Sequence, residues 1–243
     1  MRKALCWLGV CLFVATLAGT VHAAGRVPER LVYNLSWTGI PVGVATQEIT
    51  EEGMVRRIVS TARSNDWLSA FFPVEDRIES VLVKTEPFPG QSRSFRMQIR
   101  EGARRRDREL IFFQASATAI YHDRIGGERK EIPIVENTYD VYASFYYVRF
   151  LDLKVGRPVY LHILDGKELQ RIEVQVLRKE RVSTPVGEFD TIVVKPLVKP
   201  EGVFEGKGGA TIWLTDDHRR IPVKARTKVK VGSVTAILTG GEY

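Results

Sequence analysis

The chain has 243 residues, of which 44% are hydrophobic and 27% charged, and its formal net charge is +7. It is long enough for one or two domains with a large core. Its two cysteines, Cys6 and Cys11, both lie within the first 23 residues. If that segment is removed, the remaining chain has no thiol, which excludes a cysteine nucleophile, a thiolate metal site and disulfide chemistry.

The first predicted element is a secretory leader at residues 1–23. A basic head is followed by the apolar run Ala4–Leu17, and the small residues Val21 and Ala23 precede a cut near residue 24. An uncleaved anchor is the alternative, because the uncharged stretch Ala4–Val21 is nearly long enough to span a bilayer. We expect an exported protein, with the periplasm as its compartment, and no transmembrane segment after cleavage.

Positive charge remains after the leader is removed. Loss of Arg2 and Lys3 lowers the formal charge from +7 to +5. In an exported protein this charge favours anionic lipids, glycolipids or polysaccharides as partners, and not nucleic acid.

Most of the remaining chain shows the period-2 alternation of half-buried strands. The clearest strand is Ile221–Val231, where apolar and small residues alternate with basic ones. The same pattern occurs at Leu31–Trp37, Phe95–Ile99 and Ile172–Val176. Asp165-Gly166 predicts a two-residue hairpin turn between two further strands.

One segment has helical spacing instead. Val141, Phe145 and Val148 recur at helical intervals within residues 138–151, with Asn137 or Thr138 as the predicted cap. A shorter helical turn is expected at Asp66–Phe72. We therefore predict a mainly β fold in which a curved antiparallel sheet closes as a barrel or sandwich. One domain, residues 24–243, would have two halves joined by the central helix.

Several segments occur in an order that resembles an exported bacterial family, the DUF3108 domain family. The segments are Leu31–Gly43, Ser64–Trp67, Phe72–Ser80, Tyr139–Arg149, Thr184–Phe189, Ile212–Asp217 and Arg220–Lys224. The resemblance covers nearly the whole chain after the leader and implies an exported, β-rich protein. The family has no settled activity, so no catalytic residue transfers from it.

The tightest polar cluster is Asp216-Asp217-His218. Two carboxylates and an imidazole could bind a metal or perform acid–base chemistry, as in an envelope hydrolase. The simpler interpretation is a turn in which the carboxylates accept bonds from local backbone. The sequence has no Gly-x-Ser-x-Gly elbow, phosphate-binding glycine loop or dinucleotide motif.

Two groups of residues are candidates for ligand binding. A basic row on one strand could bind phosphates or carboxylates, although such rows are also found on solvated edges. Aromatic residues could line an apolar groove between helix and sheet, although the same residues could form an ordinary core. The candidates are Lys224, Arg226, Lys228, Lys230, Trp67, Phe72, Tyr142 and Tyr146.

We expect a non-enzymatic binding or envelope-assembly factor, without cofactor or metal, whose ligand is an amphiphilic anion such as a lipid or glycolipid. The alternatives are an enzyme using Asp216, Asp217 or His218 and a structural partner in an envelope protein complex. A deep apolar cavity would favour a carrier, whereas a filled core would favour an interaction module.

Overall fold

Fifteen strands pair into one continuous sheet in the computed structural model, which describes residues 27–85, 89–197 and 209–243. The predicted leader lies outside these described residues. The elements in chain order are β1 (Glu29–Trp37), β2 (Ile40–Glu52), β3 (Val55–Ser64), α1 (Asp66–Ser69), β4 (Glu75–Val83), β5 (Gln91–Glu101), β6 (Arg104–Phe113), the 3₁₀ turn η1 (Gln114–Ser116), β7 (Thr118–Asp123), β8 (Arg129–Pro133), β9 (Thr138–Tyr139), α2 (Val141–Val148), β10 (Val159–Asp165), β11 (Glu168–Thr184), β12 (Gly187–Leu197), β13 (Ala210–Thr215), β14 (Pro222–Lys228) and β15 (Ser233–Glu242).

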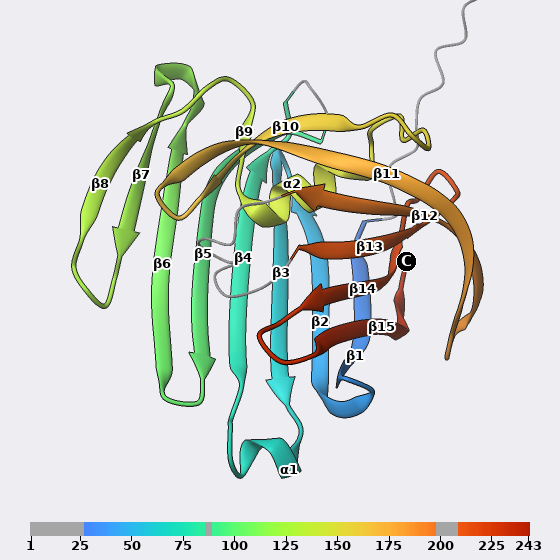
Figure 1. Cartoon of the computed structure of the whole chain (residues 1–243). Helices are drawn as coiled ribbons and strands as arrows, with labels where there is room; N and C mark the ends of the chain where they lie inside the picture. Colours follow the sequence, from blue (N-terminus) through green and yellow to red (C-terminus); the bar gives the residue numbers. More distant parts are fainter. Residues whose placement is uncertain (1–26, 86–88, 198–208) are drawn as a thin grey trace, which may run out of the picture.

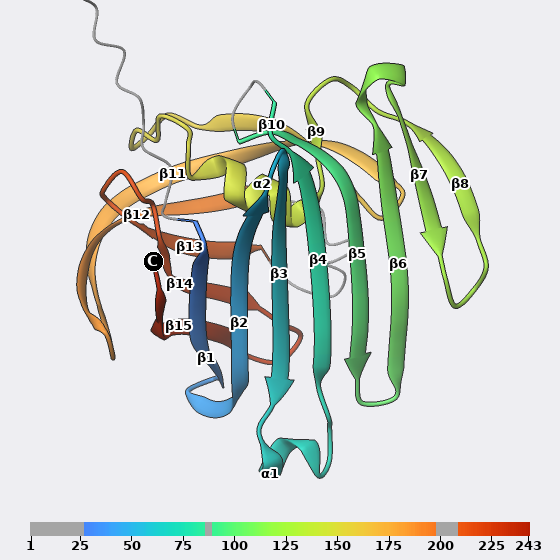
Figure 2. The same ribbon diagram turned by 180° about the vertical axis from the view of Figure 1, so that it is seen from behind.

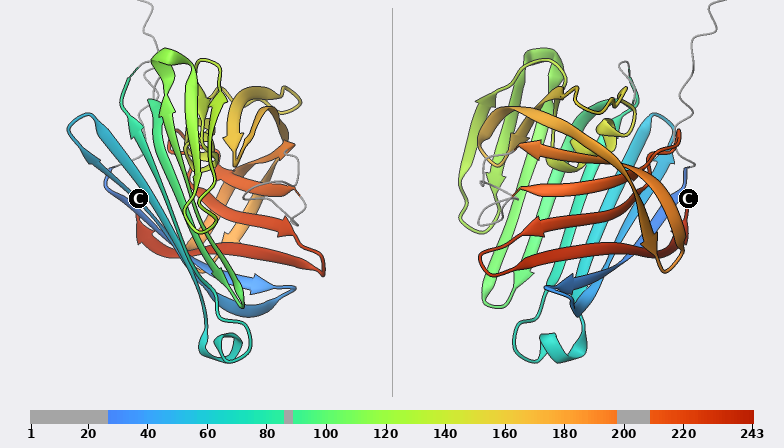
Figure 3. Two further views of the ribbon diagram at one scale, coloured as in Figure 1. Left: turned by 90° about the vertical axis from the view of Figure 1, so that its left-hand side faces the viewer. Right: turned by 45° about the vertical axis from the view of Figure 1, so that its right-hand side comes forward.

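The sheet is open, with β8 at one edge and β9 at the other. Strand β1 lies between β2 and β15, so the first and last strands are neighbours. The strand pairs of the described residues are antiparallel except for β9 and β10. Strands β1–β8 form one layer, and β10–β15 cross in front of it (Figure 1). The view from behind and the side views show the two layers with α2 between them (Figures 2 and 3). The predicted mainly β, barrel-like or sandwich fold is confirmed.

The central helix is shorter than predicted. Helix α2 spans Val141–Val148, while Thr138–Tyr139 form strand β9. The predicted caps, Asn137 and Thr138, were wrong. The cap is Asp140, because its carboxylate accepts the backbone N–H groups of Tyr142 and Ala143.

Two smaller sequence predictions also differ from the structure. In the β10–β11 hairpin Asp165 pairs with Glu168, so the turn residues are Gly166 and Lys167. Gly166 adopts the left-handed backbone conformation, with φ of 60°, that favours glycine at a hairpin turn. The short helical turn predicted at Asp66–Phe72 is α1, which ends at Ser69.

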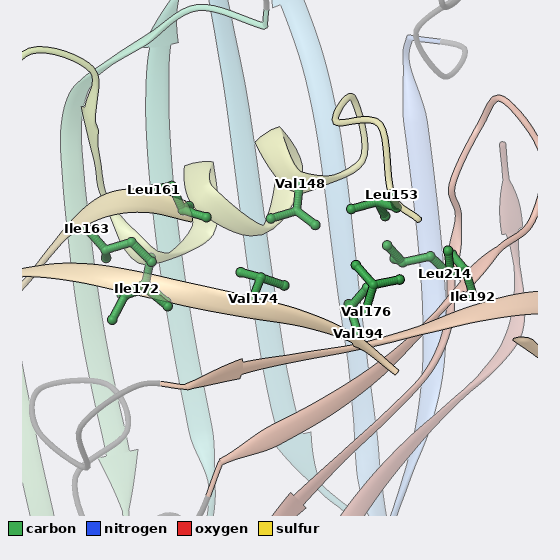
Figure 4. Packing of buried hydrophobic residues seen from close by; sticks show 11 residues of the cluster. Val148, Leu153, Leu161, Ile163, Ile172, Val174, Val176, Ile192, Val194 and Leu214 are labelled. Carbon is green, nitrogen blue, oxygen red and sulfur yellow. The ribbon is translucent and has the colours of Figure 1, made fainter. Parts of the chain in front are cut away.

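Helix α2 packs against both layers. One hydrophobic cluster joins Val141 and Val148 to strands β10–β13, and Figure 4 shows the side chains of this cluster. A second cluster joins Ala143 and Tyr146 to Ile49, Ile58 and Leu82 on β2, β3 and β4. A helix of eight residues is marginal in water, so these tertiary contacts are what keep it folded.

The carboxylate of Asp140 also ties α2 to the first layer. Its Oδ2 accepts the hydroxyls of Ser80 on β4 and Ser92 on β5, each at 2.8 Å. The side chain is fully buried. Burial raises the pKa of Asp140, although the four hydrogen bonds oppose that rise.

We expect Asp140→Ala to lower the free energy of unfolding by roughly 2–4 kcal/mol, because the helix loses its cap and two buried serine hydroxyls lose their acceptor. Chemical denaturation measures the change. The matched control is Asn65→Ala at the cap of α1, whose side chain accepts a bond from Leu68 in a more exposed turn. Equal losses in the two variants would contradict the structural role assigned to Asp140.

Candidate functional site

A cavity of about 310 Å³ lies between α2 and the inner face of the sheet. Helix α2 contributes Tyr142, Phe145 and Tyr146 to its wall. Tyr142 and Phe145 are half-buried, and their rings meet edge to face with centroids 6.4 Å apart. The cavity is roughly ten times the ~30 Å³ that one water molecule occupies in the liquid.

The second layer supplies an apolar wall to this cavity. Every second residue of β13, namely Ala210, Ile212 and Leu214, lines it, as expected when alternate side chains share one face. On the next two strands the cavity is lined by small residues. Ala225 of β14 and Ala236 of β15 are cross-strand partners, and both border the cavity. These two methyl groups leave space that larger side chains would fill.

Polar groups line the cavity on the side of the first layer. Tyr33 of β1, Gln47 of β2 and Ser60 of β3 all border it. The Tyr33 hydroxyl donates to the carbonyl oxygen of Pro222 at 2.8 Å, and the side chains of Ser60 and Tyr142 are hydrogen-bonded. Burial raises the pKa of both tyrosines, so they stay neutral donors at ordinary pH.

A buried ion pair closes one part of the wall. Arg149, the C-cap of α2, donates from two nitrogens to the two carboxylate oxygens of Glu29 at 2.8 and 2.7 Å. Both side chains are almost fully buried, and the guanidinium also lies 5.2 Å from the ring centre of Tyr146. Burial alone would lower the pKa of Arg149, but Glu29 outweighs burial and raises it. The charge on Arg149 is therefore balanced within the protein.

The predicted basic row contributes one residue to the cavity wall. Lys224 borders the cavity, and its Nζ lies 4.7 Å from the ring centre of Trp213. Arg226 donates to the hydroxyl of Ser233 at 3.1 Å and is not a lining residue. Lys228 is the exposed last residue of β14. Lys230 follows the end of the strand, so its predicted place within the strand was wrong.

The four predicted aromatic residues divide into two pairs. Tyr142 and Tyr146 line the cavity, whereas Trp67 and Phe72 lie in the α1 turn between β3 and β4. The sequence alone did not separate the two pairs, because the same aromatic residue types occur in a core, in a groove and on a surface. It also did not assign Tyr33 or Arg149 to the site. The inward alternation of Leu31 and Tyr33 was the signal available for the first of these.

The acidic cluster forms the turn between β13 and β14. The Asp217 carboxylate accepts the Thr215 hydroxyl and the backbone N–H groups of Arg219 and Arg220. Asp216 forms ion pairs with Lys179 and Arg220, and His218 is exposed. Within the described part of the chain, no three histidine, cysteine or acidic side chains are grouped as metal ligands would be.

The fold and the cavity define a class of protein: an open, barrel-like antiparallel β protein that encloses a helix and an apolar pocket beside it. In residues 27–85, 89–197 and 209–243, no helix has the length and apolar character needed to cross a membrane. Residues 32–239 match the family described as "Protein of unknown function (DUF3108)". The chain belongs to this family, as the resemblance of its segments predicted.

A solved structure shows the same kind of fold. The beta-barrel-like protein of domain of unknown function DUF1849 from Brucella abortus aligns with a TM-score of 0.56 at 9% identity, covering 90% of this chain and 99% of that chain. A Bacteroides fragilis protein with a YmcC-like fold aligns with a TM-score of 0.35 at 12% identity, covering 90% of this chain and 98% of that chain. No curated protein matches the chain.

We expect Arg149→Met to lower the free energy of unfolding by about 3–5 kcal/mol, because Glu29 would be left as a buried charge without its partner. The double variant Glu29→Gln/Arg149→Met removes both charges and should lose less than the single variant. Chemical denaturation of the wild type, the single variant and the double variant measures the three free energies of unfolding. A double variant less stable than Arg149→Met would contradict this account.

Acid should weaken the turn that holds Asp217. Burial acts to raise the pKa of this carboxyl group, but bonds from Thr215 and Arg219 outweigh burial and hold the pKa below its ordinary value. The resulting stabilisation is present above the unfolded carboxyl pKa of about 3.9 and is lost as the pH falls through the folded value. Asp217→Asn should therefore reduce the loss of stability on acidification. Denaturation midpoints measured at neutral and acid pH test this, with the exposed Glu136→Gln as control.

Proposed function

We propose that the chain is an exported, periplasmic, non-enzymatic binding protein that holds the apolar part of an anionic lipid or glycolipid in the pocket beside α2. The observation that carries the proposal is the unfilled space of about 310 Å³ inside the sheet. Its size is at the lower end of the roughly 300–1,000 Å³ of small-ligand sites.

The chemistry of the wall supports an amphiphilic occupant. Phe145, Ile212, Leu214 and Val194 present apolar surface, which favours an acyl chain or another apolar group. Lys224 is a lining residue, but its Nζ lies over Trp213, on the face of β13 opposite to Ile212 and Leu214, so it supports an anionic headgroup at the rim of the pocket and not inside it. Arg149 is neutralised by Glu29, so we assign it a structural role.

Export is supported by the sequence of residues 1–23, with its basic head, apolar run and small residues before the cut. An envelope location would give the protein access to anionic lipids and glycolipids. The same location is compatible with a structural partner in an envelope complex. The state of the pocket in the native protein distinguishes the two roles.

We expect native mass spectrometry of the protein, isolated from its own envelope, to show a retained lipid or glycolipid. Ala236→Trp should abolish that retention, because the indole would fill the space that the two alanines leave open. Lys224→Gln should weaken retention of an anionic ligand less than the tryptophan does.

The matched control is Thr235→Trp. Thr235 precedes Ala236 on β15, so its side chain points to the opposite face of the sheet. Both tryptophan variants should remain folded, with a free energy of unfolding lowered by no more than about 3 kcal/mol, the upper end of the usual cost of overpacking. A bare protein mass for the wild type, or equal retention in the two tryptophan variants, would overturn the proposal.

A further inference from the structure

One end of the molecule carries large apolar side chains that are exposed to solvent. We call it the aromatic end and define it by Trp37, Ile40, Trp67, Phe71, Phe72 and Val231. Phe71 is 83% exposed, and the other five are between 39% and 70% exposed. The α1 turn, which bears the three aromatic residues at 67–72, projects beyond the ends of the neighbouring strands (Figures 1 and 2).

Hydrogen bonds and close contacts join the four turns of this end, those after β1, β3, β5 and β14, into one surface. The indole N–H of Trp37 donates to the carbonyl oxygen of Val231 at 2.7 Å. Trp37 also pairs with Ile40 across the β1–β2 turn. The next link runs from the indole N–H of Trp67 to the carbonyl oxygen of Pro41, at 3.0 Å.

The last link reaches the turn between β5 and β6. The backbone N–H of Gly102 donates to the carbonyl oxygen of Pro73 at 2.8 Å. The ring of Phe72 lies so close to Gly102 that a Cβ there would meet it at 2.6 Å. The exposed apolar residues are therefore held together by defined contacts between turns that are far apart in the sequence.

The indole rings of Trp37 and Trp67 can be buried without leaving an unpaired hydrogen-bond donor. Burying a hydrogen-bond donor is unfavourable unless the donor has a partner. The N–H groups of Trp37 and Trp67 already donate to protein carbonyls, and phenylalanine rings have no polar atom. The aromatic end could thus enter an apolar medium with its polar side-chain atoms satisfied.

The segments beside the aromatic end are mainly basic. Residues 226–233 contain Arg226, Lys228 and Lys230 and no acidic residue, and residues 100–106 contain four arginines and one glutamate. Acidic side chains at the end are fewer than the basic ones, and two of them form ion pairs, Glu75 with Arg100 and Glu101 with Arg104, which leaves basic side chains in excess. This combination of exposed aromatic residues and basic neighbours complements an anionic lipid surface.

We propose that the aromatic end docks on the surface of an anionic lipid bilayer. Phe71 and its neighbours enter the headgroup boundary, and the basic segments contact lipid phosphates. A second copy of the chain fits this end less well, because a two-fold contact would bring the same basic segments face to face. The proposal does not depend on what the pocket holds.

The test is co-sedimentation of the full-length protein with phosphatidylcholine vesicles that do or do not contain phosphatidylglycerol. We expect binding to the anionic vesicles, with weakening as salt is added. Phe71→Ser should reduce that binding by about tenfold, because one exposed ring no longer leaves water. The double variant Lys228→Glu/Lys230→Glu should reduce binding to anionic vesicles more than Phe71→Ser does, and it should have no effect with vesicles of phosphatidylcholine alone.

The matched control is Phe113→Ser, which removes a ring that is 46% exposed at the far end of β6. Any association through the leader is common to both serine variants and cancels in their comparison. Absence of binding to anionic vesicles, or equal effects of the two serine variants, would overturn the proposal. The proposal would also be overturned if the wild type formed a dimer, did not bind vesicles, and became monomeric in Phe71→Ser. That result would assign the surface to self-association. Ala236→Trp should bind vesicles normally, which separates this result from the pocket proposal.

Discussion

The structure depends on how α2 is anchored between the two layers of the sheet. At the N-terminal end of the helix, the Asp140 carboxylate binds hydroxyls on β4 and β5. At the C-terminal end, Arg149 pairs with Glu29 on β1. A helix of eight residues has little stability of its own, so these two buried polar anchors and the apolar contacts between them determine its position. Polar groups fix where the helix lies, and apolar burial stabilises it there.

The pocket follows from that position. An open sheet of fifteen strands encloses more space than one short helix can occupy. Large side chains fill much of the remainder through the four hydrophobic clusters. Beside Ala225 and Ala236 the wall has only methyl groups, and the space there stays open. Protein interiors are normally packed to crystal-like density, so an unfilled volume of this size indicates room for a ligand.

Sequence periodicity was sufficient for the mainly β class, for strands such as β1, β5 and β11, and for the existence of the helix, because these depend on local alternation. It was less able to place the cap, since Asn137, Thr138 and Asp140 are all acceptable cap residues and only tertiary contacts select Asp140. On β14 the alternation correctly separates Ala225 from Arg226. It does not say which side faces the pocket. That information depends on how β14 lies relative to α2, across more than 70 residues of chain.

The separation of Trp67 and Phe72 from Tyr142 and Tyr146 has a physical consequence. The tyrosines enclose the pocket, and the α1 residues lie in the aromatic end. Strand β14 and the turn that follows it connect the two regions, because Thr227 borders the pocket and Val231 belongs to the aromatic end. Four residues of extended chain span at most about 14 Å, so the two regions are close. A ligand with an apolar part and a negative charge would match both the pocket and the aromatic end. Each of these regions combines apolar side chains with basic residues of the segment Lys224–Lys230. A protein that met its ligand at a bilayer would need both features on neighbouring parts of its surface, and β14 with the turn after it supplies that connection.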